Sequence, residues 1–287
     1  MNNLLFLFIF TLGIHFVGDF YLQWNRLSEK KVVFDNNLKI RSKSFLFLLL
    51  HSLIYSCCYF LLLLVCDLPS TIIFVLCVFL WHFIVDLFSP LIEIKLCKTI
   101  RFLINQILHI LFLVFALLLL ESHFRQISSS DQNLVIFISI ILFLVKPSKI
   151  FIGYFIDDIF KSYKRNKKED IVGNKDVAGV DECAKDSSNN LETNLIETDS
   201  KLHTKASSKI IHFDTGSIIG ICERLIIFAL SIFNALTAMA LIIAAKTWAR
   251  SKDLSDEQFR VKYILGTFLS ILLALVGSLA FYFLCIL

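Results

Sequence analysis

The stretch LLFLFIFTLGIHFVGDFYLQ occupies residues 4–23 and indicates the fold class of the whole chain. It is as long as the run of about 20 apolar residues that carries an α-helix across a hydrocarbon core. Two ionisable side chains, His15 and Asp19, interrupt its apolar character. Such groups are costly in a bilayer and are usually retained because they have partners and a function. The stretch therefore predicts a membrane-spanning helix that carries part of a polar site.

The composition extends this prediction to the rest of the chain. Of its 287 residues, 57% are hydrophobic and 18% are charged, with a mean hydropathy of +0.74, whereas a soluble domain is about a quarter charged. Phenylalanine is abundant, with 29 residues, while glycine and proline are scarce. This favours uninterrupted helices over the alternating strands of a membrane β-barrel. We expect an all-α, polytopic transmembrane helical bundle with about 6–8 membrane segments in contact with the lipid bilayer.

Apolar blocks and one polar segment divide the chain into four parts. These are a four-helix transmembrane core at 1–127, a fifth transmembrane helix with an amphipathic or re-entrant segment at 128–160, a polar linker at 161–208 and a C-terminal transmembrane helical module at 209–287. The linker is rich in Ser, Asn and mixed charges and lacks apolar periodicity, so we expect it to be disordered.

Loop charges orient the first helices. The 24–43 and 94–101 loops are rich in Lys and Arg, whereas the 67–70 turn and the 121–132 loop contain a single basic residue between them. Basic loops stay on the cytoplasmic side, so the N-terminus is expected outside. In the second half the loop charges conflict, unless block 217–245 is a hairpin broken near Asn234 or the segment at 148–160 is re-entrant.

Four histidines and two aspartates lie inside the first four apolar blocks. They are His15, Asp19, His51, His82, Asp86 and His109. Each aspartate follows a histidine by four residues, which places the two side chains on one helix face. Counted from the predicted cytoplasmic helix ends at about 1.5 Å per residue, all six lie about 6–17 Å below the cytoplasmic surface. The helices and their orientation are derived without the histidines, so this common level independently indicates a site.

Further polar residues accompany this layer. Gln23 continues the face of the first helix by one turn, and Asn105 and Gln106 precede the last histidine by one turn. The two His-x3-Asp helices each precede a helix with a histidine near its cytoplasmic start. Two such parallel hairpins would place the histidines around one axis normal to the membrane.

The residue types of the layer suit several chemistries. Neutral imidazoles and carboxylates together suit a divalent metal such as Zn, Fe or Mn, and a metal with an open position can activate water. The leading hypothesis is a metal-dependent hydrolase that acts on a lipid-linked or membrane-embedded substrate. The first alternative is a transporter or channel that uses the same pairs for protons or ions. The second is a non-enzymatic scaffold with a structural polar layer, whose 161–208 linker binds a cytoplasmic protein.

The C-terminal module has polar and small residues of its own. Glu223 and Arg224 are adjacent in an apolar block, and either complete the polar layer or form an ion pair that holds helices together. Small residues recur at every fourth position of the last block, at Gly266, Ser270, Ala274 and Ser278. Such a stripe is typical of a close helix–helix contact. No basic and aromatic surface pattern indicates a nucleic-acid partner.

These motifs resemble a known family. The run from Gly13 to Gln23, then His51, then His82-x3-Asp86, then Gln106-x2-His109 is similar to the bacterial domain-of-unknown-function family 3307. The resemblance implies a multi-pass protein of the bacterial cytoplasmic (inner) membrane and implies no particular activity. Family members commonly carry Asp-Gln where this chain has Asn105-Gln106. If that aspartate is a ligand or base, the resemblance implies an altered site here.

Overall fold

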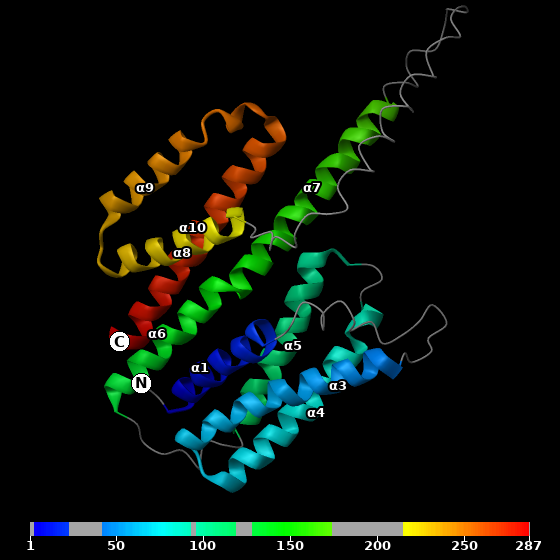
Figure 1. Ribbon diagram of the computed structural model, residues 1–287, viewed down its shortest axis with the longest axis vertical. Coiled ribbons are helices and arrows are strands. Elements are labelled where there is room, and N and C mark those ends of the chain that lie inside the picture. The colour runs from blue at the N-terminus through cyan, green and yellow to red at the C-terminus, as the bar shows by residue number, and fades with distance from the viewer. Residues whose placement is uncertain (1–2, 23–41, 93–95, 119–127, 174–214, 287) are drawn as a thin grey trace, which may run out of the picture. The chain divides into compact units, whose positions relative to one another are not determined.

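The computed structural model describes residues 3–22, 42–92, 96–118, 128–173 and 215–286. Every regular element in these ranges is a helix (Figure 1). Within them, six helices are long and apolar enough to cross a membrane. The predicted all-α transmembrane architecture is therefore confirmed. Contacts divide the chain into a unit of residues 1–159 and 219–287 and a second unit of residues 160–218, and everything described below about packing and sites belongs to the first.

The N-terminal helices pack around a common core. Their bounds are α1 Asn3–Phe16, which continues as the π-helix η1 Val17–Tyr21; α3 Ser42–Cys57, which continues as the 3-10 helix η2 Cys58–Leu64; α4 Leu68–Ile92; and α5 Lys98–Leu118. Helix α3 packs on α4, α4 packs on α5, and α1 packs on both α5 and the following helix α6 (Ser129–Val145). The shared core includes Phe6, Tyr55, Leu62, Val75 and Leu113. This packing brings the polar segments of four helices together.

Helices α6 and α7 follow one another almost without interruption. Helix α6 spans Ser129–Val145 and α7 spans Pro147–Gly173. Proline is tolerated at the first position of a helix, where its missing N–H has no intrahelical partner, and Ile150 N donates to the Lys146 carbonyl across the junction. The region expected as an amphipathic or re-entrant segment is thus a continuing helix. It also reaches into the predicted linker, since 161–173 is helical and 174–208 lies outside the described residues.

The C-terminal module consists of three helices and a short connection. They are α8 Thr215–Ile232, α9 Leu236–Ala249, the 3-10 turn η4 Asp253–Ser255 and α10 Glu257–Ile286. The turn between α8 and α9 contains Asn234 with a φ of 53°, a left-handed conformation that Asn tolerates better than most residues. The sequence left two alternatives for the second half of the chain, a hairpin within 217–245 or a re-entrant segment at 148–160. The structure has the first of these, with the break at Asn234.

The small-residue stripe of α10 faces other helices. Ser270, Ala274 and Ser278 are buried, and the Ser278 hydroxyl donates to the Phe228 carbonyl of α8 at 3.3 Å. A Cβ atom at Gly266 would lie 3.2 Å from Ile156 Cδ1 of α7. Helix α10 also packs along α6. Small side chains therefore allow close approach at this interface, as expected for helices in a membrane.

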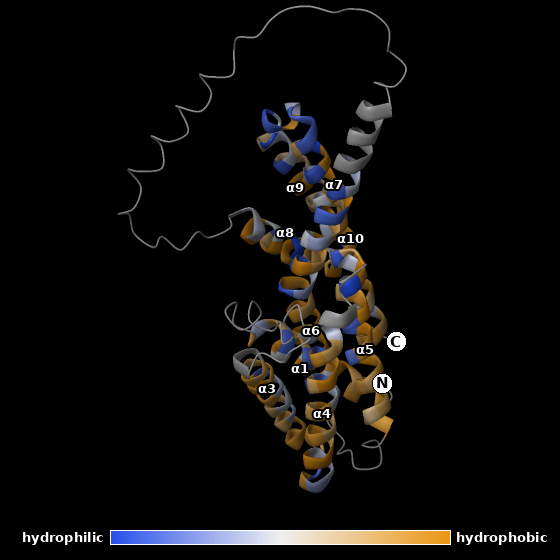
Figure 2. Cartoon of the chain, turned by 90° about the vertical axis from the view of Figure 1, so that its right-hand side faces the viewer, coloured by the Kyte–Doolittle hydropathy of each residue, from blue (hydrophilic) through white to orange (hydrophobic). Residues whose placement is uncertain are grey.

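The outward faces of the helices are strongly apolar. Leu64 is 72% exposed and Phe268 is 66% exposed. Hydrophobic residues dominate α3, α4 and α10, whereas hydrophilic residues gather where α9 connects to α10 (Figure 2). Exposed apolar surface of this extent is compatible with a lipid environment rather than with water. The chain is a multi-pass membrane protein in contact with the bilayer.

Replacing Gly13 by alanine tests the contact between α1 and α6. A Cβ atom at Gly13 would overlap the hydroxyl of Ser139, which donates to the Ile9 carbonyl at 3.3 Å. We expect Gly13→Ala to lower the free energy of unfolding by about 1–3 kcal/mol through overpacking. Gly153→Ala is the matched control, because a Cβ there meets nothing within 4 Å, and helix propensity should make it neutral or stabilising by up to about 1 kcal/mol. Thermal unfolding in detergent compares them; equal midpoints would contradict the described packing.

Candidate functional site

All four predicted histidines and both aspartates lie together between four helices. We call His15, Asp19, His51, His82, Asp86 and His109 the His/Asp cluster. None of these residues is more than 6% exposed. Ring contacts link the four histidines one after another in space, with centroid distances of 5.8 Å from His15 to His109, 4.5 Å from His109 to His82 and 5.1 Å from His82 to His51. The common level expected from the sequence thus corresponds to one buried group of side chains.

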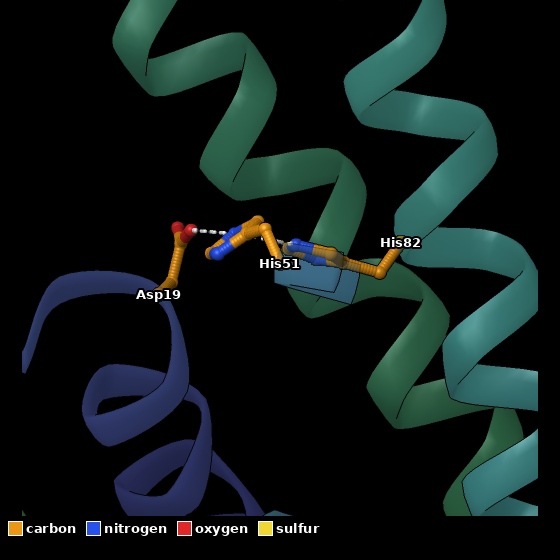
Figure 3. A group of neighbouring side chains, drawn as sticks. All are labelled: Asp19, His51 and His82. Carbon is orange, nitrogen blue, oxygen red and sulfur yellow. Dashed lines mark hydrogen bonds and ion pairs between the residues drawn. The ribbon is translucent and has the colours of Figure 1, made fainter. Parts of the chain in front are cut away.

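Asp19, His51 and His82 form a group that could hold a metal ion. They come from η1, α3 and α4, and His51 lies between the other two (Figure 3). One ligand atom from each lies within 4.8 Å of the others. His51 Nε2 is 3.2 Å from His82 Nε2 and 3.7 Å from Asp19 Oδ1. Three potential metal-ligating atoms from three helices therefore lie close to one another.

The Asp86 carboxylate faces three imidazole nitrogens. The Nε2 atoms of His82, His109 and His51 lie 3.5, 3.7 and 3.8 Å from its oxygens. These separations exceed those of ordinary hydrogen bonds, which are about 2.7–3.2 Å between heavy atoms. Three histidine nitrogens thus surround the Asp86 carboxylate at distances longer than those of hydrogen bonds.

A chain of hydrogen bonds connects the cluster to two tyrosines. Gln106 Nε2 donates to Asp19 Oδ2 at 2.8 Å, so the amide oxygen of Gln106 is left to accept from His15 Nε2 at 2.9 Å. His15 Nδ1 then accepts from the Tyr55 hydroxyl at 2.7 Å, and Tyr59 donates to Tyr55 at 2.9 Å. Both ring nitrogens of His15 are used in this chain. His15 is therefore placed to orient Asp19 through Gln106.

The two His-x3-Asp motifs behave differently because their helices differ. In α4 the spacing is that of a regular α-helix, and His82 Nε2 lies 3.5 Å from Asp86. In the first helix a π-helical turn begins at Val17, marked by the bond from Leu22 N to the Val17 carbonyl at 3.0 Å. Asp19 contacts His51 directly and reaches His15 through Gln106. The same four-residue spacing therefore occurs in two different local helix geometries.

Two buried nitrogens of the cluster lack hydrogen-bond partners within the described parts of the chain. They are His82 Nδ1 and His109 Nε2. The His82 ring is stacked on Tyr55, with centroids 3.7 Å apart, so its orientation is held by packing. Most buried side-chain polar atoms in proteins have at least one partner, and these two mark places where an ion or a water molecule can bind.

The supporting residues fall into different places. Gln106 joins the cluster, while Gln23 lies outside the described residues. Asn105 lines a small cavity with Ser89 and Arg101. The departure from the family pattern at position 105 therefore concerns the lining of that cavity.

Glu223 and Arg224 belong to a different set of contacts. Glu223 forms an ion pair with Lys246, and Arg224 Nε donates to the Leu144 carbonyl at 2.8 Å. The described contacts of these two residues are in the C-terminal module and at the end of α6. The hypothesis that they complete the histidine layer is thus not supported by their geometry.

Tyr55 and Tyr59 are the residues that the sequence reasoning missed. Their signal is present, since His51, Tyr55 and Tyr59 follow one another at four-residue spacing, which keeps side chains on one helix face. A search limited to imidazole, carboxylate and carboxamide side chains overlooks them. Including hydroxyl groups at helical spacing from a buried histidine would have found both.

Residues 6–138 match the model of a protein family of unknown function (DUF3307). The match confirms the resemblance drawn from the motifs. It contains the entire His/Asp cluster together with Gln106 and both tyrosines. No curated protein and no solved structure matches the chain.

Removing the Tyr55 hydroxyl tests the hydrogen-bond chain. In Tyr55→Phe, His15 Nδ1 and the Tyr59 hydroxyl both lose their partner inside the protein, which should lower the free energy of unfolding by about 1–3 kcal/mol. Tyr282→Phe is the matched control, because Tyr282 is half exposed. Thermal unfolding in detergent measures both. A Tyr55→Phe midpoint equal to that of Tyr282→Phe would contradict the described chain.

Proposed function

We propose that the His/Asp cluster binds one divalent transition-metal ion within the membrane and that the chain is a metal-dependent hydrolase. The separation of 3.2 Å between His51 Nε2 and His82 Nε2 carries this proposal. Two ligands of one tetrahedral ion, each about 2.0–2.1 Å from it, lie about 3.3 Å from each other. The two imidazoles are therefore already spaced as ligands of a single ion.

The remaining donors suit the same ion. Asp19 is the third member of the group and approaches His51 from η1. Asp86 and His109 offer further donors, and His109 Nε2, which has no hydrogen bond in the described structure, lies 3.7 Å from an Asp86 oxygen. A buried polar atom without a partner is unfavourable, and coordination would satisfy it. The set exceeds the three protein ligands of a typical catalytic zinc site.

The donor types favour particular metals. The cluster contains imidazoles and carboxylates, and its six residues include no cysteine. Thiolates select soft ions, whereas imidazole with carboxylate suits Zn, Fe or Mn. A divalent ion of this kind supplies Lewis acidity that can polarise a carbonyl or phosphoryl oxygen.

The hydrogen-bond chain supports a positioning role rather than proton conduction. The Gln106 amide donates to Asp19 and accepts from His15. An amide of this kind keeps its own protons, so it orients its neighbours more readily than it passes protons between them. Partners that orient metal ligands commonly change metal affinity about 10–100-fold when removed. This favours the metal site over a proton pathway through the same residues.

The location of the cluster suggests the substrate class. It lies within apolar helices, at a level that the loop charges place near the cytoplasmic leaflet. A substrate that reaches it from the bilayer would be lipid-linked or membrane-embedded. A carboxylate of the cluster that does not bind the metal, Asp19 or Asp86, can accept a proton from water.

Metal analysis of detergent-purified protein tests the site. We expect about one ion per chain in the wild type and near-complete loss in His51→Ala/His82→Ala, because a site without the two closely spaced imidazoles binds weakly. His203→Ala, which removes a histidine of the predicted linker, is the matched control and should keep the wild-type content. Circular dichroism and gel filtration verify that the variants remain folded. Equal, substoichiometric metal in all three proteins would overturn the proposal.

A separate assay tests hydrolysis. Chromogenic ester and phosphodiester substrates carrying an acyl chain, dispersed in mixed micelles, should release their chromophore with the metal-loaded wild type and with His203→Ala. In His51→Ala/His82→Ala, release should fall to the background rate, because the Lewis acid is lost. Stoichiometric metal without turnover of any tested ester would reject the hydrolase while leaving the metal site standing.

A further inference from the structure

Arg224 is a buried cation whose hydrogen-bond partners are neutral. The residue is 3% exposed and lies on α8. Its Nε atom donates to the Leu144 carbonyl at 2.8 Å, and Nη1 donates to the Ser270 hydroxyl at 3.5 Å. Nη2 is buried and has no hydrogen-bond partner within the described ranges. A buried charge normally requires a partner of opposite charge, so this guanidinium has capacity for an anion.

The neighbouring carboxylate is already engaged. Glu223 forms an ion pair with Lys246, whose Nζ atom also donates to the Thr267 hydroxyl at 3.1 Å. Glu223, Arg224 and Lys246 therefore contribute two positive charges and one negative charge at this place. One further negative charge would balance the group.

Other hydrogen-bond donors surround the same place. The buried Tyr263 hydroxyl has no hydrogen-bond partner among the residues that the structure describes, and Lys246 Nζ lies 5.1 Å from the centre of its ring. Tyr263, Thr267 and Ser270 follow one another along α10 at spacings of four and three, which places them on one face. We call Glu223, Arg224, Lys246, Tyr263, Thr267 and Ser270 the C-terminal polar cluster. It has more donors than acceptors.

The surroundings of this cluster fit a lipid headgroup. The α9–α10 connection and the first turn of α10 contain the basic residues Arg250, Lys252 and Arg260, and basic residues next to membrane helices are attracted to anionic headgroups. Lys246 near the end of α9 and Tyr263 near the start of α10 flank this connection.

We propose that the C-terminal polar cluster binds one phosphate group, supplied by an anionic phospholipid or by soluble phosphate. A phosphate offers several acceptor oxygens, one of which would accept from the free Nη2 of Arg224 and others from neighbouring donors of the cluster such as Lys246. Guanidinium groups suit phosphate because their planar donors match its oxygens. The guanidinium lies along α8 beside Gly220, where a Cβ atom would be in ordinary contact with Nη1 at 3.6 Å. The site is separate from the His/Asp cluster and does not depend on the proposed metal.

Ligand-dependent thermal stabilisation tests this site. Purified protein in detergent micelles is titrated in separate arms with phosphatidylglycerol, phosphatidylcholine and inorganic phosphate. A ligand that binds the folded state raises the unfolding midpoint. Stabilisation by phosphatidylglycerol alone identifies a lipid headgroup, whereas stabilisation by inorganic phosphate identifies a soluble source. In either case Arg224→Gln should weaken the response at least about tenfold, because a charge-assisted hydrogen bond is lost.

Matched variants separate binding from folding. Arg250→Gln removes an arginine that lies over the Phe259 ring and should keep the wild-type response. Arg224→Lys retains the charge and should keep part of the response even if Arg224→Gln does not fold, while His51→Ala/His82→Ala should respond as the wild type does. No stabilisation of the wild type by either phosphate source, or a response that Arg224→Gln and Arg224→Lys leave unchanged, would overturn the proposal.

Discussion

The requirement that polar side chains satisfy one another inside apolar helices governs the N-terminal half of the structure. Hydrocarbon offers no hydrogen bonds, so Asp19 depends on His51 and Gln106 from two other helices. Asp86 likewise depends on histidines of α3, α4 and α5. These contacts are available at one level only, and a helix shifted by a turn would lose them. The polar layer therefore sets the register of four helices. Their apolar surfaces alone would tolerate several relative positions along the helix axes.

The two polar clusters have opposite chemical needs. The His/Asp cluster is rich in potential metal-ligating atoms, with imidazole nitrogens and carboxylate oxygens facing one another at 3.5–3.8 Å, and a cation could bind between them. The C-terminal polar cluster is rich in donors, with Arg224 Nη2 and the Tyr263 hydroxyl lacking partners in the described structure, and an anion would complete it. A purely structural network would be expected to match donors with acceptors within each cluster. The imbalance in each is what favours ligand binding.

Much of the fold could be predicted from the sequence, because membrane helices are defined by length and apolarity, and the break at Asn234 follows from a residue that tolerates positive φ. The convergence of the histidines followed from comparing their depths. The π-helical turn at Val17 could not be predicted, because His15-x3-Asp19 and His82-x3-Asp86 have identical spacing and the difference arises from packing. The direct succession of α6 and α7 was not predicted from the sequence, and it is possible because Pro147 stands at the start of α7, where proline is acceptable.

The orientation of α5 about its own axis determines which of its residues face the His/Asp cluster. It therefore determines what asparagine at position 105, where the resembled family commonly has aspartate, changes in this chain. Gln106 and His109 are three residues apart and share a helix face, and both meet the cluster, through Asp19 and Asp86 respectively. Asn105 lies about 100° around the helix from Gln106 and lines a cavity with Ser89 and Arg101. An aspartate at that position would place a negative charge beside Arg101 and would add no donor to the group of Asp19, His51 and His82. The exchange of aspartate for asparagine therefore alters the electrostatics of the cavity next to the site, while the proposed metal ligands of this chain are all present.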